Sequence, residues 1–150
     1  ILATTQTTQS HAYKQALKNE KRSINVIEIA CPMLVPFAEK GEETSLDAEK
    51  WAKKYINQVG DADVIIHGCS HYPYFEPYWK GCLPHATFIN PGVTAANQLK
   101  ETLMSLNIQS NNDRPSLSFY ISGPEDIILQ HIKTQFASEP YQLLSKIPVQ

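Results

Sequence analysis

The chain has 150 residues and a mass of 16.9 kDa, and 42% of its residues are hydrophobic, which suits one domain with a real core. Its 13 basic and 15 acidic residues are interleaved and leave a formal charge of -2, which argues against a nucleic-acid-binding protein. No apolar run approaches the ~18 residues of a membrane span, and no signal peptide opens the chain. We therefore expect a cytoplasmic protein with no membrane partner. Three cysteines are an odd number for a disulfide framework, so we expect reduced thiols.

Short apolar runs alternate with amphipathic helices, a pattern that predicts an α/β fold with a mainly parallel sheet and helices on both faces. The first predicted strand, Ile1–Thr4, opens the chain without an initiator methionine, so we expect a piece of a longer protein. Further strands are predicted at Ile24–Ala30, Asp63–His67, Ala86–Asn90 and Leu117–Ile121. Helices are predicted at Ser10–Lys21, from Pro32 to near Gly41, from Thr44 to Gly60, from the Pro91-Gly92 turn to about Leu106, and at Pro124–Phe136.

The helix before the third strand has the clearest signature. Thr44, followed three residues later by Asp47, predicts its N-cap, and Gly60 ends it. Between them one apolar stripe recurs at three- and four-residue steps: Ala48, Trp51, Ala52, Tyr55, Ile56 and Val59. By contrast, the tail from Glu139 to Gln150 has little periodicity, and we predict no element there.

Reactive residues gather where three predicted strands end. Ligands of open parallel sheets bind outside the carboxyl ends of the strands. Three loops leave such ends: Thr4–Ser10, Cys31–Glu39 and Gly68–Pro73. We therefore expect one edge of the sheet to carry Thr4, Cys31, Glu39, Cys69 and His71.

The loop Gly68-Cys69-Ser70-His71-Tyr72-Pro73 combines a thiol, a hydroxyl and an imidazole. A thiol is useful as a base only if its pKa falls, and a nearby imidazolium or helix N-terminus lowers it. His71 supplies the imidazole, and a helix beginning near Pro73 would supply N–H groups that also hold a carboxylate. The alternative is a buried structural cysteine beside a hydrogen-bonded histidine.

Three segments, in order, resemble motifs of the glutamate racemases within the aspartate/glutamate racemase family. Gly68–Pro73 resembles Gly-Cys-Thr-His-Tyr-Pro, with Ser70 at the Thr position. Leu2–Ser10 resembles Leu-Ala-Thr-x-x-Thr-x-x-Ser, and Ala30–Glu39 is similar to Ala-Cys-Pro-x-x-Val-Pro-x-x-Glu. Two further departures are His67, where an aliphatic residue is usual, and Asn90, which replaces an Asp.

The resemblance implies a cofactor-independent glutamate racemase. Such an isomerase interconverts L- and D-glutamate by two-base thiol/thiolate proton transfer and supplies D-glutamate for peptidoglycan synthesis. It implies that Cys69 is an acid/base, that His71 relays protons, that Glu39 assists, and that the substrate contacts are Thr4, Thr7, Ser70 and His71. Neither pyridoxal phosphate nor a metal is implied, and no Lys-centred cofactor motif occurs.

The resemblance covers only the C-terminal part of such an enzyme. The family's other cysteine lies in an Ala-Cys-Asn-Thr motif and an Asp-Ser-Gly motif opens its chains, but neither occurs here. By this analogy residues 1–91 form the second α/β domain, and residues 92–150 return to an absent first domain. Cys31 would approach the substrate from the same side as Cys69, so we interpret Cys31 and Cys82 as structural. We expect the chain alone to be inactive. The sequence leaves open whether it forms a homodimer.

Three alternatives remain at this stage. Imidazole and thiolate suit zinc, and five such side chains fall within a short stretch: His67, Cys69, His71, Cys82 and His85. The second is a related amino-acid racemase such as an aspartate racemase, or a family member without catalysis, although His71-Tyr72-Pro73 after the cysteine favours the glutamate branch. The third is a protein-binding role, for which no motif is present. Of the other histidines, we expect His11 to face solvent and His131 to pack within the last helix.

Overall fold

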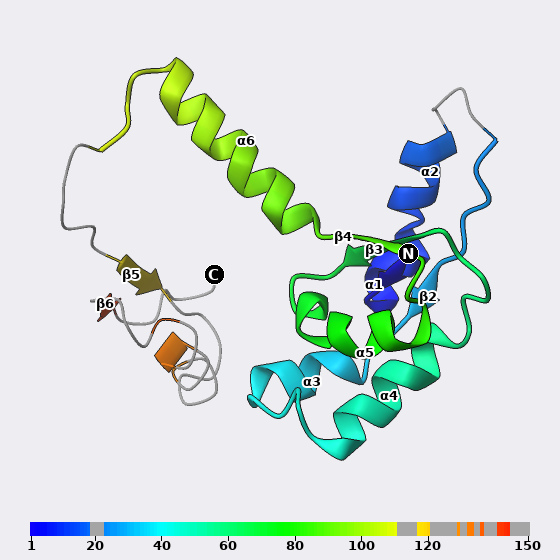
Figure 1. The fold of residues 1–150 in the computed structure, drawn as a ribbon. Helices are drawn as coiled ribbons and strands as arrows, with labels where there is room; N and C mark the ends of the chain where they lie inside the picture. Colours follow the sequence, from blue (N-terminus) through cyan, green and yellow to red (C-terminus); the bar gives the residue numbers. More distant parts are fainter. Residues whose placement is uncertain are drawn as a thin grey trace.

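The computed structural model describes residues 1–18, 23–110, 117–120, 129, 132–133, 136 and 141–144. Four parallel strands form a sheet in the order β2-β1-β3-β4 (Figure 1). These strands are β1 (Leu2–Ala3), β2 (Ile29–Ala30), β3 (Val64–Gly68) and β4 (Thr87–Ile89). A separate parallel pair is made by β5 (Leu117–Tyr120) and β6 (Tyr141–Leu144). The predicted α/β fold with a parallel sheet is confirmed, although β6 falls in the tail where no element was expected.

The helices are α1 (Thr5–Ser10), α2 (Ala12–Lys18), α3 (Leu34–Glu39), α4 (Leu46–Ile56), α5 (Glu76–Cys82) and α6 (Pro91–Ser105), and a 3₁₀ helix, η1, spans Tyr72–Phe75. The predicted start of the helix Ser10–Lys21 is wrong, because Ser10 ends α1 and the helix is interrupted at His11. That residue adopts a left-handed conformation with φ 51° and separates α1 from α2. The predicted end at Lys21 lies outside the described residues.

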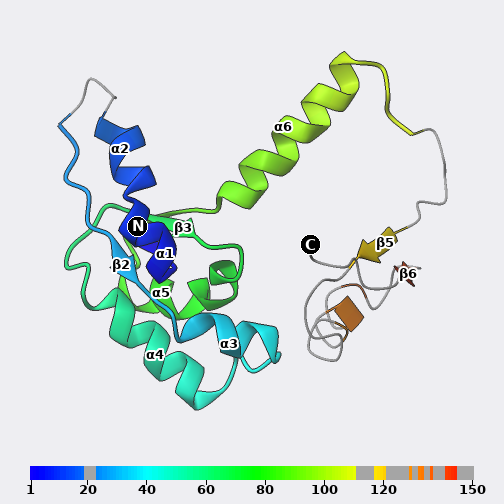
Figure 2. The same ribbon diagram turned by 180° about the vertical axis from the view of Figure 1, so that it is seen from behind.

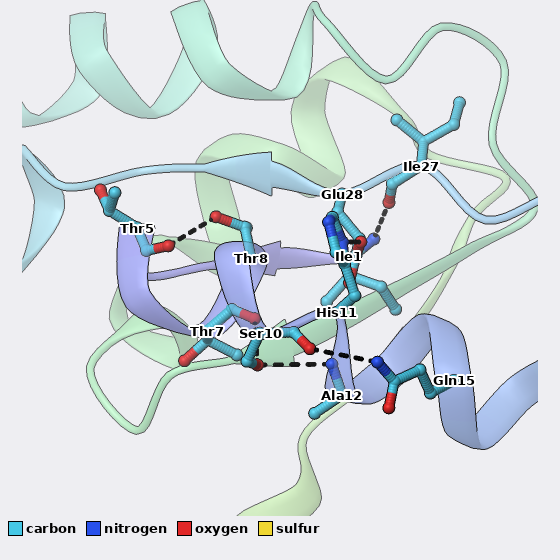
Figure 3. A network of polar contacts seen from close by, with 10 residues as sticks. All are labelled: Ile1, Thr5, Thr7, Thr8, Ser10, His11, Ala12, Gln15, Ile27 and Glu28. Atoms are coloured by element: carbon cyan, nitrogen blue, oxygen red, sulfur yellow. Dashed lines mark hydrogen bonds and ion pairs between the residues drawn. The ribbon is translucent and has the colours of Figure 1, made fainter.

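Hydroxyl side chains satisfy the backbone around this break, as Figure 3 shows. Ser10 Oγ donates to the Thr7 carbonyl at 2.7 Å and accepts from the Ala12 N–H at 3.3 Å. His11 is exposed, as expected, and its Nδ1 lies 2.7 Å from Glu28 Oε2. This contact with Glu28 links the α1–α2 junction to the segment that leads into β2.

The sheet register brings three strand ends level with one another. Ala3 pairs with Ala30 of β2 on one side and with Gly68 of β3 on the other. A Cβ at Gly68 would come 2.6 Å from the Ala3 Cβ, so only glycine allows β1 and β3 to approach this closely. The predicted strand Ile24–Ala30 is much shorter than expected, since only its last two residues join the sheet.

Helix α4 supplies much of the core. Its N-cap is Ser45, whose Oγ accepts from the Ala48 N–H at 3.2 Å, so the predicted cap at Thr44 was one residue early. The expected apolar stripe packs inward, and the Nε1–H of buried Trp79 donates to the Ala52 carbonyl at 3.0 Å. The largest fully buried side chains of the described residues are Leu2, Cys31, Leu34, Ile56, Ile65, His67, Tyr72, Phe75 and Trp79.

Helix α6 behaves differently. Asn90 caps it by accepting from the Gly92 N–H at 2.9 Å, and the helix then leaves the part of the molecule that contains the four-stranded sheet (Figures 1 and 2). None of its residues is buried. Of the predicted final helix Pro124–Phe136, most residues lie outside the described part, His131 among them. No described helix is long and apolar enough to span a membrane. We refer to residues 1–18 and 23–90 as the sheet body.

Candidate active site

Three candidate residues directly follow three adjacent strands. Thr4 follows β1, Cys31 follows β2 and Cys69 follows β3. Because the strands are parallel and the preceding residues pair in register, all three lie at the same edge of the sheet. The structure therefore places Thr4, Cys31 and Cys69 together at one edge, as predicted.

The Cys69 loop forms a tight turn after β3. The Tyr72 N–H donates to the Cys69 carbonyl at 3.2 Å, which folds the loop back. Cys69 Sγ then lies 3.6 Å from His71 Nδ1, and both side chains are half-buried, whereas Ser70 is exposed. A thiol and an imidazole are therefore in contact, and one can pass a proton to the other.

The electrostatic prediction for Cys69 was wrong in this chain. Burial raises the pKa of the Cys69 thiol, the His71 backbone N–H lowers it, and the negative charge of Glu39 adds a further increase. A helix does begin near Pro73, but it is the short 3₁₀ helix η1, and α5 begins only at Glu76. Burial therefore outweighs the groups that were expected to lower the pKa.

The remaining predicted site residues flank Cys69. Thr4 caps α1 by accepting from the Thr7 N–H at 3.2 Å, and the two threonine hydroxyl oxygens lie 2.9 Å apart. Glu39 is the exposed last residue of α3, and its charge reaches the Cys69 thiol. Two hydroxyls, a thiol, an imidazole and a carboxylate thus share one edge. These groups can hold the charged ends of an amino acid and exchange a proton with it.

The other two cysteines differ from Cys69. Cys31 is fully buried in the core, its Sγ lies 3.5 Å from the Ile29 carbonyl to which it donates, and burial raises the pKa of its thiol to about 12. Cys82 is half-buried at the end of α5 and packs against the core. All three thiols are free.

The five side chains of the zinc alternative do not converge. His67 is buried against Trp79, with ring centroids 5.4 Å apart, and its Nε2 lies 3.5 Å from Glu76 Oε2. His85 pairs with Asp61 at 2.9 Å. Across the described residues, no group of three or more His, Cys, Asp or Glu side chains is arranged to hold a metal ion.

One residue at this edge was missed by sequence reasoning. The buried hydroxyl of Tyr72 donates to the carbonyl oxygens of both Ala3, at 3.0 Å, and Cys31, at 2.9 Å. The sequence pattern assigns this tyrosine no role at the site. Its place directly after His71 was the available signal, because a side chain there must lie beside the strand ends.

The chain is an α/β protein with a parallel sheet and a cysteine–histidine pair at the carboxyl end of a central strand. No protein-family model matches it. It is 36% identical to a glutamate racemase of Synechococcus sp. (strain CC9605), over 99% of this chain and 58% of that protein. It is 32% identical to a glutamate racemase of Shouchella clausii (strain KSM-K16), over 82% of this chain and 46% of that protein.

Solved structures agree. The crystal structure of a glutamate racemase isoform from Bacillus anthracis matches 99% of this chain and 57% of its own, with a TM-score of 0.82 and 25% identity. That of a glutamate racemase from Francisella tularensis, in complex with D-glutamate, shares the fold with a TM-score of 0.82, 22% identity, and coverage of 99% of this chain and 56% of its own. The chain is therefore a relative of the glutamate racemases, and it spans about half the length of the curated relatives it matches.

Proposed function

We propose that this chain is the C-terminal part of a cofactor-independent glutamate racemase, in which Cys69 is one of two acid/base thiols. The observation that carries the proposal is the contact between Cys69 Sγ and His71 Nδ1, 3.6 Å apart at the strand-end edge shared with Thr4. Relatives named glutamate racemase support glutamate as the substrate. Interconversion of its enantiomers would supply D-glutamate for peptidoglycan in the cytoplasm.

Racemisation needs acid/base groups on both faces of the α-carbon. A thiolate on one face removes the α-proton, and a thiol on the other face returns a proton. Because burial raises the pKa of Cys69, this residue rests as the neutral thiol at neutral pH, which is the proton-donating form. His71 is placed to take or return the Cys69 proton between turnovers. Thr4, Thr7, Ser70 and Glu39 would orient the substrate along the same edge.

The second thiol would come from outside this chain. Cys31 and Cys82 are unsuited, since the first is fully buried and the second lies at the far end of α5. We infer that residues 1–91 form one domain and that residues 92–150 belong with a second one. The exposed apolar side chains of α6 support this division, because a partner domain would cover them.

A chimera tests the proposal. This chain replaces the matching part of the Synechococcus glutamate racemase, to which it is 36% identical. We expect the chimera to interconvert L- and D-glutamate, and Cys69→Ser to reduce the rate by roughly 10²-fold or more. Cys82→Ser is the matched control and should keep the rate within about twofold, because it lies away from the reacting edge. A chimera whose activity survives Cys69→Ser would refute the assignment.

A further inference from the structure

Tyr72 joins the three strand-end loops of the candidate site through one hydroxyl group. Its oxygen lies 3.0 Å from the Ala3 carbonyl, at the end of β1, and 2.9 Å from the Cys31 carbonyl, just after β2. Its own backbone N–H holds the Cys69 carbonyl after β3. One residue therefore contacts the loop that begins at Thr4, the loop that leads to Glu39, and the loop that carries Cys69.

The two carbonyls that accept from the Tyr72 hydroxyl also accept from backbone N–H groups. The Ala3 carbonyl already accepts from the Cys31 N–H at 2.9 Å, and the Cys31 carbonyl accepts from the Leu34 N–H at 3.3 Å. Neither acceptor needs the tyrosine in order to be satisfied. The single phenolic proton is shared between the Ala3 carbonyl in β1 and the Cys31 carbonyl just after β2, so the hydroxyl bridges the two strand ends in addition to their backbone hydrogen bond. The ring itself is fully buried and meets Trp79 edge-on, with centroids 6.0 Å apart, so the hydroxyl cannot swing away.

We propose that Tyr72 is a positioning residue, which holds the Cys69–His71 pair in register with Thr4 and with the segment that carries Glu39. Its bearing on catalysis rests on the proposed function of Cys69, whereas its effect on the Cys69 thiol does not. The substitution Tyr72→Phe removes the hydroxyl and keeps the buried ring. The loop should then relax outward, and Cys69 should lose part of its burial.

The reactivity of Cys69 with iodoacetamide, followed by peptide mapping across a pH series, reads out this change in the 150-residue chain. Burial is the largest influence on the pKa of Cys69 and outweighs the His71 N–H, so relaxation should move the midpoint of the profile to lower pH. We expect a shift of about half a unit, which gives about threefold faster labelling near pH 7.5. Cooperative thermal unfolding of the variant would establish that it is folded.

Tyr78→Phe is the matched control. Its hydroxyl also donates to a backbone carbonyl, that of Glu43 at 3.3 Å, but this hydrogen bond ties α5 to the loop before α4 and not to a strand end. If loss of any buried tyrosine hydrogen bond loosened the fold in general, both variants should change the Cys69 profile alike. A Cys69 profile that does not move to lower pH in Tyr72→Phe, or that moves equally in Tyr78→Phe, would overturn the proposal. A shift confined to Tyr72→Phe would support it even if the chimera showed no racemisation, so the two proposals fail separately.

The unsubstituted chain provides a second measurement that does not depend on the folding of a variant. A tyrosine hydroxyl that is buried and shared between two carbonyls exchanges its proton slowly, so Tyr72 should give an observable hydroxyl resonance in spectra of tyrosine-labelled protein. The hydroxyl of Tyr120, a residue that is 61% exposed, should exchange too fast to be seen. Equal exchange at the two residues would contradict the arrangement on which the proposal rests.

Discussion

Helices α4 and α6 use similar side chains with opposite results. Both carry apolar residues at helical spacing. In α4 four of these residues are buried, and Tyr55 and Ile56 pack into the core beside Ala48 and Ala52. In α6 no residue is buried, and Leu99 is 60% exposed.

The contrast shows which part of the molecule supplies its own core. The α4 stripe meets α3 and α5 within the sheet body, and Trp79 of α5 donates a hydrogen bond to Ala52. The α6 stripe meets no equivalent surface among the described residues. Apolar side chains exposed along one helix mark an interaction surface. The domain division proposed above assigns this surface of α6 to a second domain, and the predictions below test that assignment.

The largest expected effect concerns activity of the chain on its own. If α6 marks a missing domain, the face of the substrate opposite Cys69 lacks its acid/base, and the 150-residue chain should not racemise glutamate at a useful rate. Loss of a general acid or base costs roughly 10²–10⁴-fold, and loss of enclosure adds to this. Each enantiomer is incubated in deuterated buffer, and chirality and deuterium content are followed together. Robust interconversion that disappears in Cys69→Ala would show that a second base lies within this chain.

The next effect concerns stability and tests the comparison directly. Trp79→Ala removes a fully buried side chain and its hydrogen bond to Ala52, and should lower the free energy of unfolding by about 3–5 kcal/mol in urea titrations. Leu99→Ala in α6 should change it by no more than about 0.5 kcal/mol, because the side chain is already exposed. In the chimera the same Leu99→Ala substitution should cost about 2 kcal/mol or more. An equal cost in both contexts would mean that α6 gains no partner there.

Sequence reasoning located the site edge well, for a physical reason. Alternating apolar runs and helices imply parallel strands, and parallel strands place their carboxyl ends together. Thr4, Cys31 and Cys69 follow from that rule alone, and the pairing of Ala3 with Ala30 and Gly68 bears it out. The α4 stripe was equally accessible, because its period is local. The exact N-cap depends on which side chain bonds to the first turn. The sequence predicts Thr44, whereas Ser45 makes that hydrogen bond in the structure.

What the sequence could not give depends on three-dimensional packing. The sign of the Cys69 pKa shift is decided by burial, which no local pattern reports, so the expected decrease became an increase. The hydroxyl of Tyr72 finds its partners 69 and 41 residues away. The break at His11 needs a left-handed backbone at a residue with a side chain, which the helical pattern did not predict. Each failure involves a contact or conformation beyond the reach of sequence periodicity.

A smaller effect separates the thiols within the sheet body. Cys31 is fully buried with a pKa of about 12, so its alkylation at pH 8 should be at least roughly tenfold slower than that of half-buried Cys69. We expect Cys69 to be labelled faster than Cys31, because its side chain is only half-buried. Peptide mapping after brief iodoacetamide treatment measures the order, and labelling in urea should abolish the differences. Faster reaction of Cys31 than of Cys69 in the folded chain would contradict this prediction.

The smallest effect concerns His67, a buried residue of β3 that also departs from the family pattern. Neither ring nitrogen has a hydrogen-bond partner, and the ring packs against Trp79 and Phe88. Burial lowers the pKa of His67 below its ordinary value of 6.5, Glu76 opposes this and Lys80 adds to it. The folded chain therefore binds fewer protons than the unfolded chain just below pH 6.5. The contribution of His67 to the free energy of unfolding is therefore fully present above pH 6.5. It is lost as the pH drops toward the lowered pKa.

His67→Leu should remove this dependence, because leucine fills similar space without a titrating group. The free energy of unfolding of the unsubstituted chain should fall faster with acid than that of the variant, by up to roughly 1.4 kcal/mol per pH unit below pH 6.5. Urea titrations at half-unit intervals from pH 8 to 5 measure the two slopes. His85→Leu is the control, since the half-exposed His85 and its exposed partner Asp61 form a surface pair that contributes little. Parallel slopes for the unsubstituted chain and His67→Leu would mean that the buried ring takes up its proton in the folded state as readily as in the unfolded chain, with Glu76 fully offsetting burial.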